Sequence, residues 1–160
     1  MVGMTGHAGL PPPTAELVTT ALRDTLRTYV PNLVGVTMLG PGADQLFARV
    51  VLELGGTLYV VQPTVGMQYR DSFPDAEARR GYDELYSQAS HVQVLEHTES
   101  TEQAHMDAGR AVVGRADVLV AVWDGQPSRG LGGTADVVAY ARQRGVPVKV
   151  IWPEGASRHA

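Results

Sequence analysis

Short, nearly continuous apolar runs alternate along the chain with longer segments whose apolar residues recur every three or four positions. The apolar runs predict six β-strands, at residues 2–5, 33–39, 57–61, 91–95, 118–123 and 146–151. The longer segments predict five helices, at residues 14–29, 44–54, 75–90, 101–115 and 135–144. Because the strands are continuous runs and not alternating ones, they are typical of strands buried on both faces of a parallel sheet.

This regular alternation predicts an α/β fold, a Rossmann-like open parallel sheet of about six strands with helices on both faces. The 160 residues suit one domain, which we place at residues 1–152, followed by a short C-terminal tail at 153–160. Thr14 is the expected N-cap of the first helix. Pro63 is expected to close the third strand, and residues 66–74 to form a loop.

Composition narrows the functional classes. Thirteen basic and seventeen acidic residues give a net charge of −4, which excludes a generally basic surface, so we expect neither a nucleic-acid nor a membrane partner. The absence of cysteine excludes disulfides, thiolate nucleophiles and cysteine-ligated metals, and the histidines are too scattered to predict a metal site. No apolar run approaches the roughly 20 residues of a membrane span and no signal peptide is visible, so a cytoplasmic protein is expected.

Four loops follow predicted strands and carry residues suited to binding. In an open parallel sheet, ligands bind beyond the carboxyl ends of the strands, where the strand order reverses. The loops are 5–7 (Thr-Gly-His), 40–44 (Gly-Pro-Gly-Ala-Asp), 63–70 and 124–134. Two of them place glycine directly before a helix, where backbone N–H groups favour an anion.

The glycine-rich loop before the last helix is the better phosphate site. Gly130, Gly132 and Gly133 precede Thr134, and Arg129 lies beside them. Exposed N–H groups, a hydroxyl and a guanidinium would converge on one oxyanion. The alternative is a flexible turn in which Thr134 caps the helix. The loop is not a Walker motif, since no lysine follows the glycines, and the first strand does not lead into a dinucleotide fingerprint.

Three acids are candidates for catalysis or ribose binding. Asp44 stands at a helix start, where it either stabilises the helix dipole or accepts a hydrogen bond from a ribose hydroxyl. Asp124 follows the predicted strand at residues 118–123 and is either a turn residue or an acid that faces the ligand pocket. Asp136 lies in the first turn of the last helix, where dipole stabilisation is the simpler explanation.

Several other side chains have two interpretations each. His7 follows the first strand and either faces the crevice or is a satisfied polar residue. Tyr69 and Arg70 either stack on a base and bind a charge, or anchor their loop. Arg110 either reaches the crevice from its helix or remains a surface residue.

Five segments in order, 5–7, 42–45 (Gly-Ala-Asp-Gln), 69–70, 116–125 and 132–136 (Gly-Gly-Thr-Ala-Asp), resemble the SLOG superfamily. This Rossmann-like group includes relatives of the Lonely Guy enzymes and of DprA, and the resemblance spans about residues 2–152. It implies binding of a nucleotide or nucleotide-derived molecule, with phosphate held by the glycine-rich loop. It also implies oligomers, and we expect at least a homodimer, built on small residues such as Ala76, Ala104, Ala108 and Ala111.

The sequence departs from the Lonely Guy pattern, Pro-Gly-Gly-x-Gly-Thr-x-x-Glu, at its acid. Val137 stands where the glutamate would be, and Asp136 is one position early, about 100° away around the helix. This counts against N-glycosidase activity and leaves phosphate binding intact. The first function expected is therefore binding or sensing of a nucleotide. The alternatives are an N-glycosidic hydrolase or deoxyribosyltransferase-like enzyme, and a carrier resembling the molybdenum-cofactor carriers.

The candidate site residues follow from these loops and from the resemblance, and no cofactor is expected apart from a nucleotide-like ligand. The catalytic candidates are Asp44, Asp124 and Asp136. The ligand-binding candidates are Thr5, Gly6, His7, Gly42, Ala43, Asp44, Tyr69, Arg70, Arg110, Asp124, Arg129, Gly130, Gly132, Gly133 and Thr134.

Overall fold

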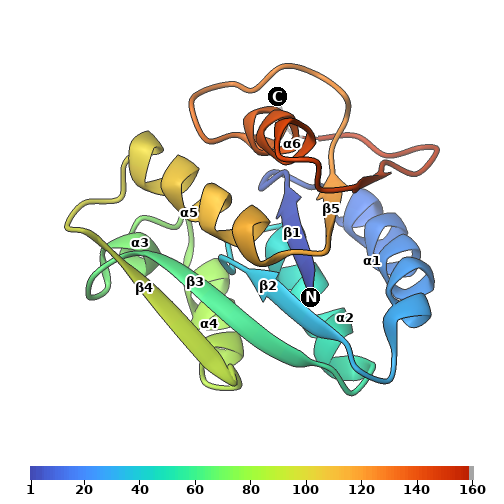
Figure 1. Cartoon of the computed structure of the whole chain (residues 1–160), viewed down its shortest axis with the longest axis horizontal. Coiled ribbons are helices and arrows are strands. Elements are labelled where there is room, and N and C mark those ends of the chain that lie inside the picture. Colours follow the sequence, from blue (N-terminus) through green and yellow to red (C-terminus); the bar gives the residue numbers. More distant parts are fainter. Residues whose placement is uncertain (159–160) are drawn as a thin grey trace.

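The computed structural model describes residues 1–158, which form a six-stranded, wholly parallel sheet with helices on both faces (Figure 1). The strands are β1 (Val2–Gly6), β2 (Val34–Thr37), β3 (Thr57–Thr64), β4 (His91–His97), β5 (Val118–Val122) and β6 (Val148–Ile151). Their order across the sheet is β4-β3-β2-β1-β5-β6. The predicted Rossmann-like α/β fold is therefore confirmed. The strand order reverses between β1 and β5, since β2, β3 and β4 follow on one side of β1 and β5 and β6 lie on the other.

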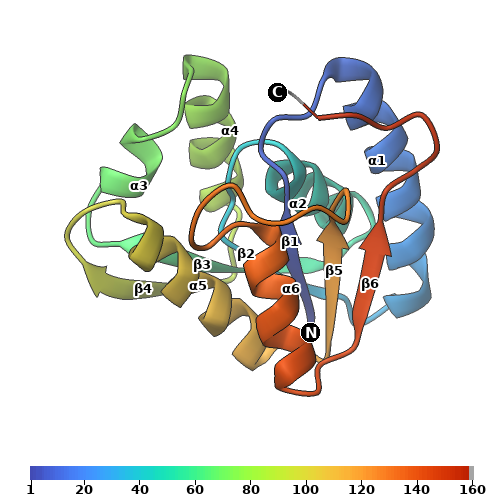
Figure 2. The same cartoon turned by 90° about the horizontal axis from the view of Figure 1, so that it is seen from above.

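The helices divide between the two faces of the sheet (Figure 2). One face carries α1 (Pro12–Leu26), α2 (Ala43–Glu53) and α4 (Ala76–Tyr86), and the other carries α5 (Glu102–Arg115) and α6 (Thr134–Gln143). Each face has its own apolar core: Phe47 and Leu22 are fully buried in the first, and Val112 and Leu119 in the second. The apolar runs of the sequence thus fill both sides of the strands.

The first helix begins earlier than expected. Its cap is Pro11, and the helix starts at Pro12 because proline is tolerated in a first turn, where an N–H has no partner in the helix. A 3-10 turn over Arg27–Tyr29 follows it. Thr14 is therefore not the N-cap; it is buried, and its hydroxyl accepts a hydrogen bond from the Ser157 N–H at 2.9 Å. The described part of the expected tail, residues 153–158, accordingly folds back against α1.

Two expectations around the third strand were wrong. Strand β3 continues through Pro63 to Thr64, because its pairing with β2 ends at Val60 and its register with β4 shifts between Gln62 and Thr64. A proline that donates no N–H is tolerated at such an irregularity. The expected loop at 66–74 contains a short helix, α3 (Gln68–Asp71).

Two of the four small residues expected to form a contact between subunits are used inside the protein. Ala104 and Ala108 on α5 are fully buried, and a side chain at Gly109 would collide with Val137 of α6. These positions let the two helices approach each other. The expected homodimer therefore stays a prediction without support from Ala104 or Ala108. No helix within residues 1–158 is long and apolar enough to cross a membrane.

Candidate functional site

A cavity of about 480 Å³ opens beyond the carboxyl ends of the central strands, at the place where the strand order reverses. Its walls come from four loops that follow β1, β2, β3 and β5, and from one face of α5. Of the predicted ligand residues it is lined by Thr5, Gly6, His7, Asp44, Tyr69, Arg129, Gly130, Gly132, Gly133 and Thr134. The volume is in the range of small-molecule sites.

The glycine-rich loop is held by its own hydrogen bonds. The Gly132 N–H donates to the Asp136 carboxylate at 3.1 Å, and the Gly133 N–H donates to the Gly130 carbonyl at 3.3 Å. Within residues 1–158, the N–H groups of Thr134 and Ala135, in the first turn of α6, have no acceptor. The anion-binding donors are therefore expected one or two residues later than the glycines.

Asp136 has a structural role in this loop. Its carboxylate fixes the Gly132 N–H, its own N–H donates to the Ser128 hydroxyl at 3.1 Å, and it does not line the cavity. Val137 does line it, although its side chain is almost fully buried beside Gly109. The position that carries glutamate in the Lonely Guy pattern is thus occupied by a core residue.

His7 joins three segments at the edge of the cavity. Its Nε2 accepts the Asp124 N–H at 3.0 Å, and its Nδ1 lies 3.4 Å from the Thr134 hydroxyl at the start of α6. Burial and the nearby Arg158 charge lower the pKa of His7, against the opposing effect of Asp124. The imidazole is therefore neutral at pH 7, and a donor directed at Nε2 places its proton on Nδ1, toward Thr134.

Arg158 is a site residue that the sequence did not reveal. Its guanidinium lines the cavity, with Nη1 3.5 Å from His7 Nε2 and 3.7 Å from Asp124 Oδ2. Asp124 itself does not line the cavity; its carboxylate accepts the Gln126 N–H at 3.0 Å and lies 3.1 Å from His7 Nε2. Burial acts to raise the pKa of Asp124, but the Gln126 hydrogen bond and the charges of His7 and Arg158 lower it on balance.

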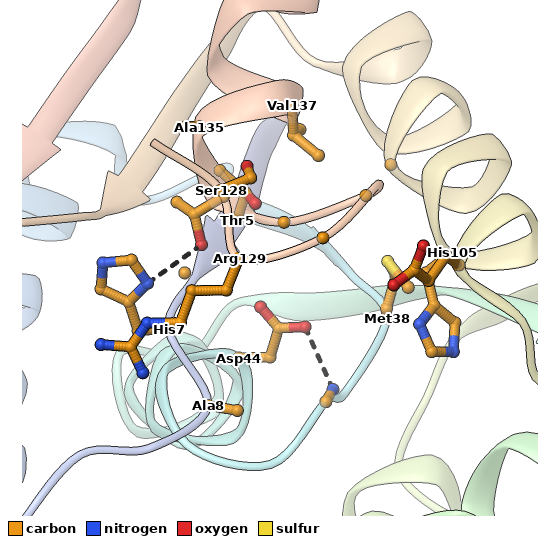
Figure 3. Close-up of a pocket in the computed structure, with 18 of the residues that line it drawn as sticks. Thr5, His7, Ala8, Met38, Asp44, His105, Ser128, Arg129, Ala135 and Val137 are labelled. Atoms are coloured by element: carbon orange, nitrogen blue, oxygen red, sulfur yellow. Dashed lines mark hydrogen bonds between the residues drawn. The ribbon is translucent and has the colours of Figure 1, made fainter. Parts of the chain in front are cut away.

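Asp44 is a buried carboxyl group near the middle of the cavity. The side chain is only 9% exposed, and its Oδ2 accepts the Gly40 N–H at 3.0 Å (Figure 3). Figure 3 shows the carboxyl group pointing toward the loop before α6, with His7 and Arg129 on one side and His105 on the other. Burial raises the pKa of Asp44 to about 7, and the Gly40 hydrogen bond opposes that rise only in part.

The far wall of the cavity is aromatic and polar. Tyr69 is buried, with its ring edge-on to those of Phe73 and His105. Burial lowers the pKa of His105 against the opposing effect of Glu102, and the His105 Nε2 lies 2.8 Å from the Ser100 hydroxyl. The sequence predicted only that the histidines are too scattered for a metal site and gave no role to His105, which lines the cavity. This position becomes apparent only in the fold, where α5 lies beside the glycine-rich loop.

Besides Asp124, four predicted ligand residues lie outside the cavity. Arg70 pairs with Asp83 at 2.7 Å, and Arg110 lies 3.5 Å from Asp107 and over the Tyr140 ring. Gly42 and Ala43 affect the cavity through the backbone. Gly42 has a φ of 83°, and the Ala43 N–H donates to the carbonyl of His7, which lines the cavity, at 3.1 Å. Within the described chain, no group of three histidine or acidic side chains is arranged to hold a metal ion.

Comparison with known proteins supports the fold. No family model and no curated protein matches the sequence. The structure is similar to DNA processing protein A of Streptococcus pneumoniae, with a TM-score of 0.69 and 18% identity over 96% of this chain and 50% of that one. The Helicobacter pylori DNA processing protein A binds single-stranded DNA. Its structure gives a TM-score of 0.68 and 16% identity over 98% of this chain and 67% of that one.

The molybdenum cofactor carrier protein of Chlamydomonas reinhardtii is also similar, with a TM-score of 0.56 and 18% identity over 93% of this chain and 73% of the carrier. The likeness to these proteins, all below 20% identical, confirms the Rossmann-like fold, and the SLOG resemblance itself stays a prediction. This chain spans half the length of the pneumococcal protein. The likeness to a single-stranded DNA binding protein runs against the expectation that nucleic acid is excluded as a partner.

Proposed function

We propose that this protein binds or senses a nucleotide or nucleotide-derived small molecule, with a phosphate of the ligand at the N-terminus of α6. The observation that carries the proposal is the pair of N–H groups on Thr134 and Ala135, which have no acceptor within residues 1–158 and lie where the cavity meets the helix. A helix N-terminus favours an anion through these groups and through its dipole. Arg129 lines the same cavity and adds a positive charge.

The proteins of similar structure bind ligands of two different kinds. One binds single-stranded DNA and another carries the molybdenum cofactor. A carrier of the latter kind therefore remains an alternative, and short single-stranded DNA belongs in the ligand panel beside the mononucleotides. The compact cavity, about 480 Å³, favours a mononucleotide-sized ligand over a long strand.

We predict that replacing Ala135 with proline will weaken nucleotide binding by about 10- to 100-fold. Proline removes one of the two unbonded N–H groups, and a helix start tolerates it; α1 of this chain itself begins Pro12-Pro13. Binding is measured by thermal shift over a nucleotide panel, since a ligand at 100 times its Kd stabilises the fold by about 2.7 kcal/mol.

The matched control for this experiment is Arg110→Gln, which removes a charge outside the cavity and is expected to leave affinity unchanged. Arg129→Gln is expected to weaken binding and to reduce its dependence on salt. Equal affinity in the wild type and in a folded Ala135→Pro variant would contradict a phosphate at α6.

A second candidate function, cleavage of an N-glycosidic bond, is favoured by one observation. Asp44 is an acid in the cavity whose pKa is near neutral, as a general acid requires. Against it stand Val137, which occupies the place of the glutamate of the Lonely Guy pattern, and Asp136, whose carboxylate is held by Gly132.

We therefore expect binding without efficient hydrolysis when the protein is incubated with nucleoside monophosphates and free base is followed by chromatography. Rapid release of base that disappears in Asp44→Asn, while the nucleotide still binds, would establish the enzyme instead. Asp136→Asn serves as the comparison, because the structure gives that carboxylate a loop-holding role.

A further inference from the structure

We infer that the Asp44 carboxylate accepts a hydrogen bond from an O–H or N–H group on the non-phosphate part of the ligand, and thereby selects ligands that carry this donor. The inference rests on the proposed function and adds to it a specificity-determining residue. The donor belongs either to a ribose hydroxyl or to an amino group of the base, since both offer the same chemistry to a carboxylate.

The position of Asp44 opposite α6 is the first argument. Asp44 lies in the first turn of α2, and its carboxyl group points across the cavity toward the loop before α6 (Figure 3). The two structural features come from opposite faces of the sheet, α2 from one and α6 from the other. A ligand whose phosphate is bound by the N–H groups of Thr134 and Ala135 therefore places its sugar or base near Asp44.

The second argument is the incomplete set of partners around this carboxyl group. Oδ2 accepts the Gly40 N–H, and no other donor within residues 1–158 bonds to either oxygen. Among the residues that the structure describes, no cation pairs with the side chain, although only 9% of it is exposed. A buried carboxylate is expensive unless it is paired or hydrogen-bonded, so its remaining acceptor sites call for a donor from outside the chain.

The charged and titratable groups around Asp44 are compatible with this role. Burial, and after it the charge of the nearby Asp44, raise the pKa of Tyr69 on α3, so the phenol remains protonated. His7 and His105, from the β1 end and α5, have lowered pKa values and are neutral at pH 7. Two cations line the same cavity near His7, Arg129 (Figure 3) and Arg158, and Glu102 lines it near His105. Tyr69, His7 and His105 are thus uncharged neighbours of Asp44, and they suit the sugar or base of a nucleotide better than a second phosphate.

The test is a comparison of ligands in two proteins. Affinities of the wild type and of Asp44→Asn are measured by calorimetry for adenosine 5′-monophosphate, its 2′-deoxy and 3′-deoxy analogues, inosine 5′-monophosphate and inorganic phosphate. We expect the wild type to lose about 10- to 100-fold in affinity for one analogue, the one that lacks the donor, and Asp44→Asn to show no such preference. Loss with a deoxy analogue assigns the ribose, and loss with inosine monophosphate assigns the base.

A pH series gives a readout that a merely structural role would not move. Because a bound donor favours the ionised carboxylate, and the pKa of Asp44 is about 7, affinity of the wild type relative to Asp44→Asn is expected to rise about tenfold between pH 6 and pH 8. The phosphate of the ligand titrates in both proteins and cancels in this ratio. Asp24→Asn, an identical substitution on the exposed side of α1, is expected to behave as the wild type.

The outcomes separate the two proposals. Equal affinity of the wild type for all the nucleotides, or a preference that survives in Asp44→Asn, overturns the role of Asp44 and leaves nucleotide binding standing. Absence of binding for every nucleotide and for phosphate overturns the proposed function, and the inference with it.

Discussion

At pH 8, replacing Asp44 with asparagine is expected to raise the free energy of unfolding by on the order of 4 kcal/mol. Burial raises the pKa of this carboxyl group from its ordinary value of 3.8 to about 7. Each pKa unit of that difference corresponds to about 1.4 kcal/mol. Asparagine has the same shape, can still accept the Gly40 N–H and has no charge to bury.

The sign of the pH dependence follows from the raised pKa in the folded state. Between pH 3.8 and about 7 the unfolded chain carries an ionised Asp44 while the folded chain keeps it protonated, so this residue's contribution to stability falls as pH rises through that window. The advantage of Asp44→Asn over the wild type is therefore expected to grow by roughly 2–3 kcal/mol between pH 5 and pH 8. Urea unfolding at both pH values measures it.

The control for this measurement is Asp24→Asn, whose exposed side chain lies near Arg27 on the surface. A difference between wild type and Asp44→Asn that does not change with pH would show that the carboxyl group is ionised in both states at an ordinary pKa. If the expected gain is found, a natural acid stands where a neutral residue would give a more stable protein. Such stability losses are characteristic of residues kept for function.

The fold could be predicted from the sequence because the strands are continuous apolar runs, which only a sheet covered on both faces can bury. The convergence of the loops after β1, β2 and β5 follows from the same prediction, since the carboxyl ends of parallel strands share one edge. The sequence alone therefore predicts that Thr5, His7, Asp44 and Thr134 lie together, and in the structure they line one cavity.

The rest depends on geometry that no local pattern contains. The orientation of the Gly132 and Gly133 N–H groups is set by Asp136 and Gly130, so the unbonded donors fall on Thr134 and Ala135 instead. Arg158 reaches the site only because its segment folds back on α1 through a hydrogen bond from Ser157. The Ser157–Thr14 contact joins residues 143 positions apart, which no spacing rule predicts. The contacts within the glycine-rich loop are local, but the sequence does not show which of its N–H groups they use.

The second large effect is expected at Gly42, the residue before α2. Its φ of 83° with a ψ of −125° is a backbone conformation essentially restricted to glycine, which costs a residue with a side chain about 1–3 kcal/mol. A Cβ at this position would also fall on the backbone oxygen of Ala8, closer than real Cβ atoms approach. Because the atom in the way is backbone and not a flexible side chain, the loop after β1 must move. We expect Gly42→Ala to lower the free energy of unfolding by about 3–4 kcal/mol.

Gly55→Ala is the matched control, since Gly55 has a φ of 78° but open space where the Cβ would lie. It is expected to lose only the cost of a positive φ, about 1–2 kcal/mol, so the difference between the two variants measures the collision with Ala8 together with the rarer backbone conformation of Gly42. Gly42→Ala is also expected to weaken nucleotide binding, because the Ala43 N–H bonds to the His7 carbonyl and Asp44 follows directly. Equal losses of stability in the two variants would mean that the loop after β1 yields freely, and that Gly42 does not hold His7 and Asp44 at their places in the cavity.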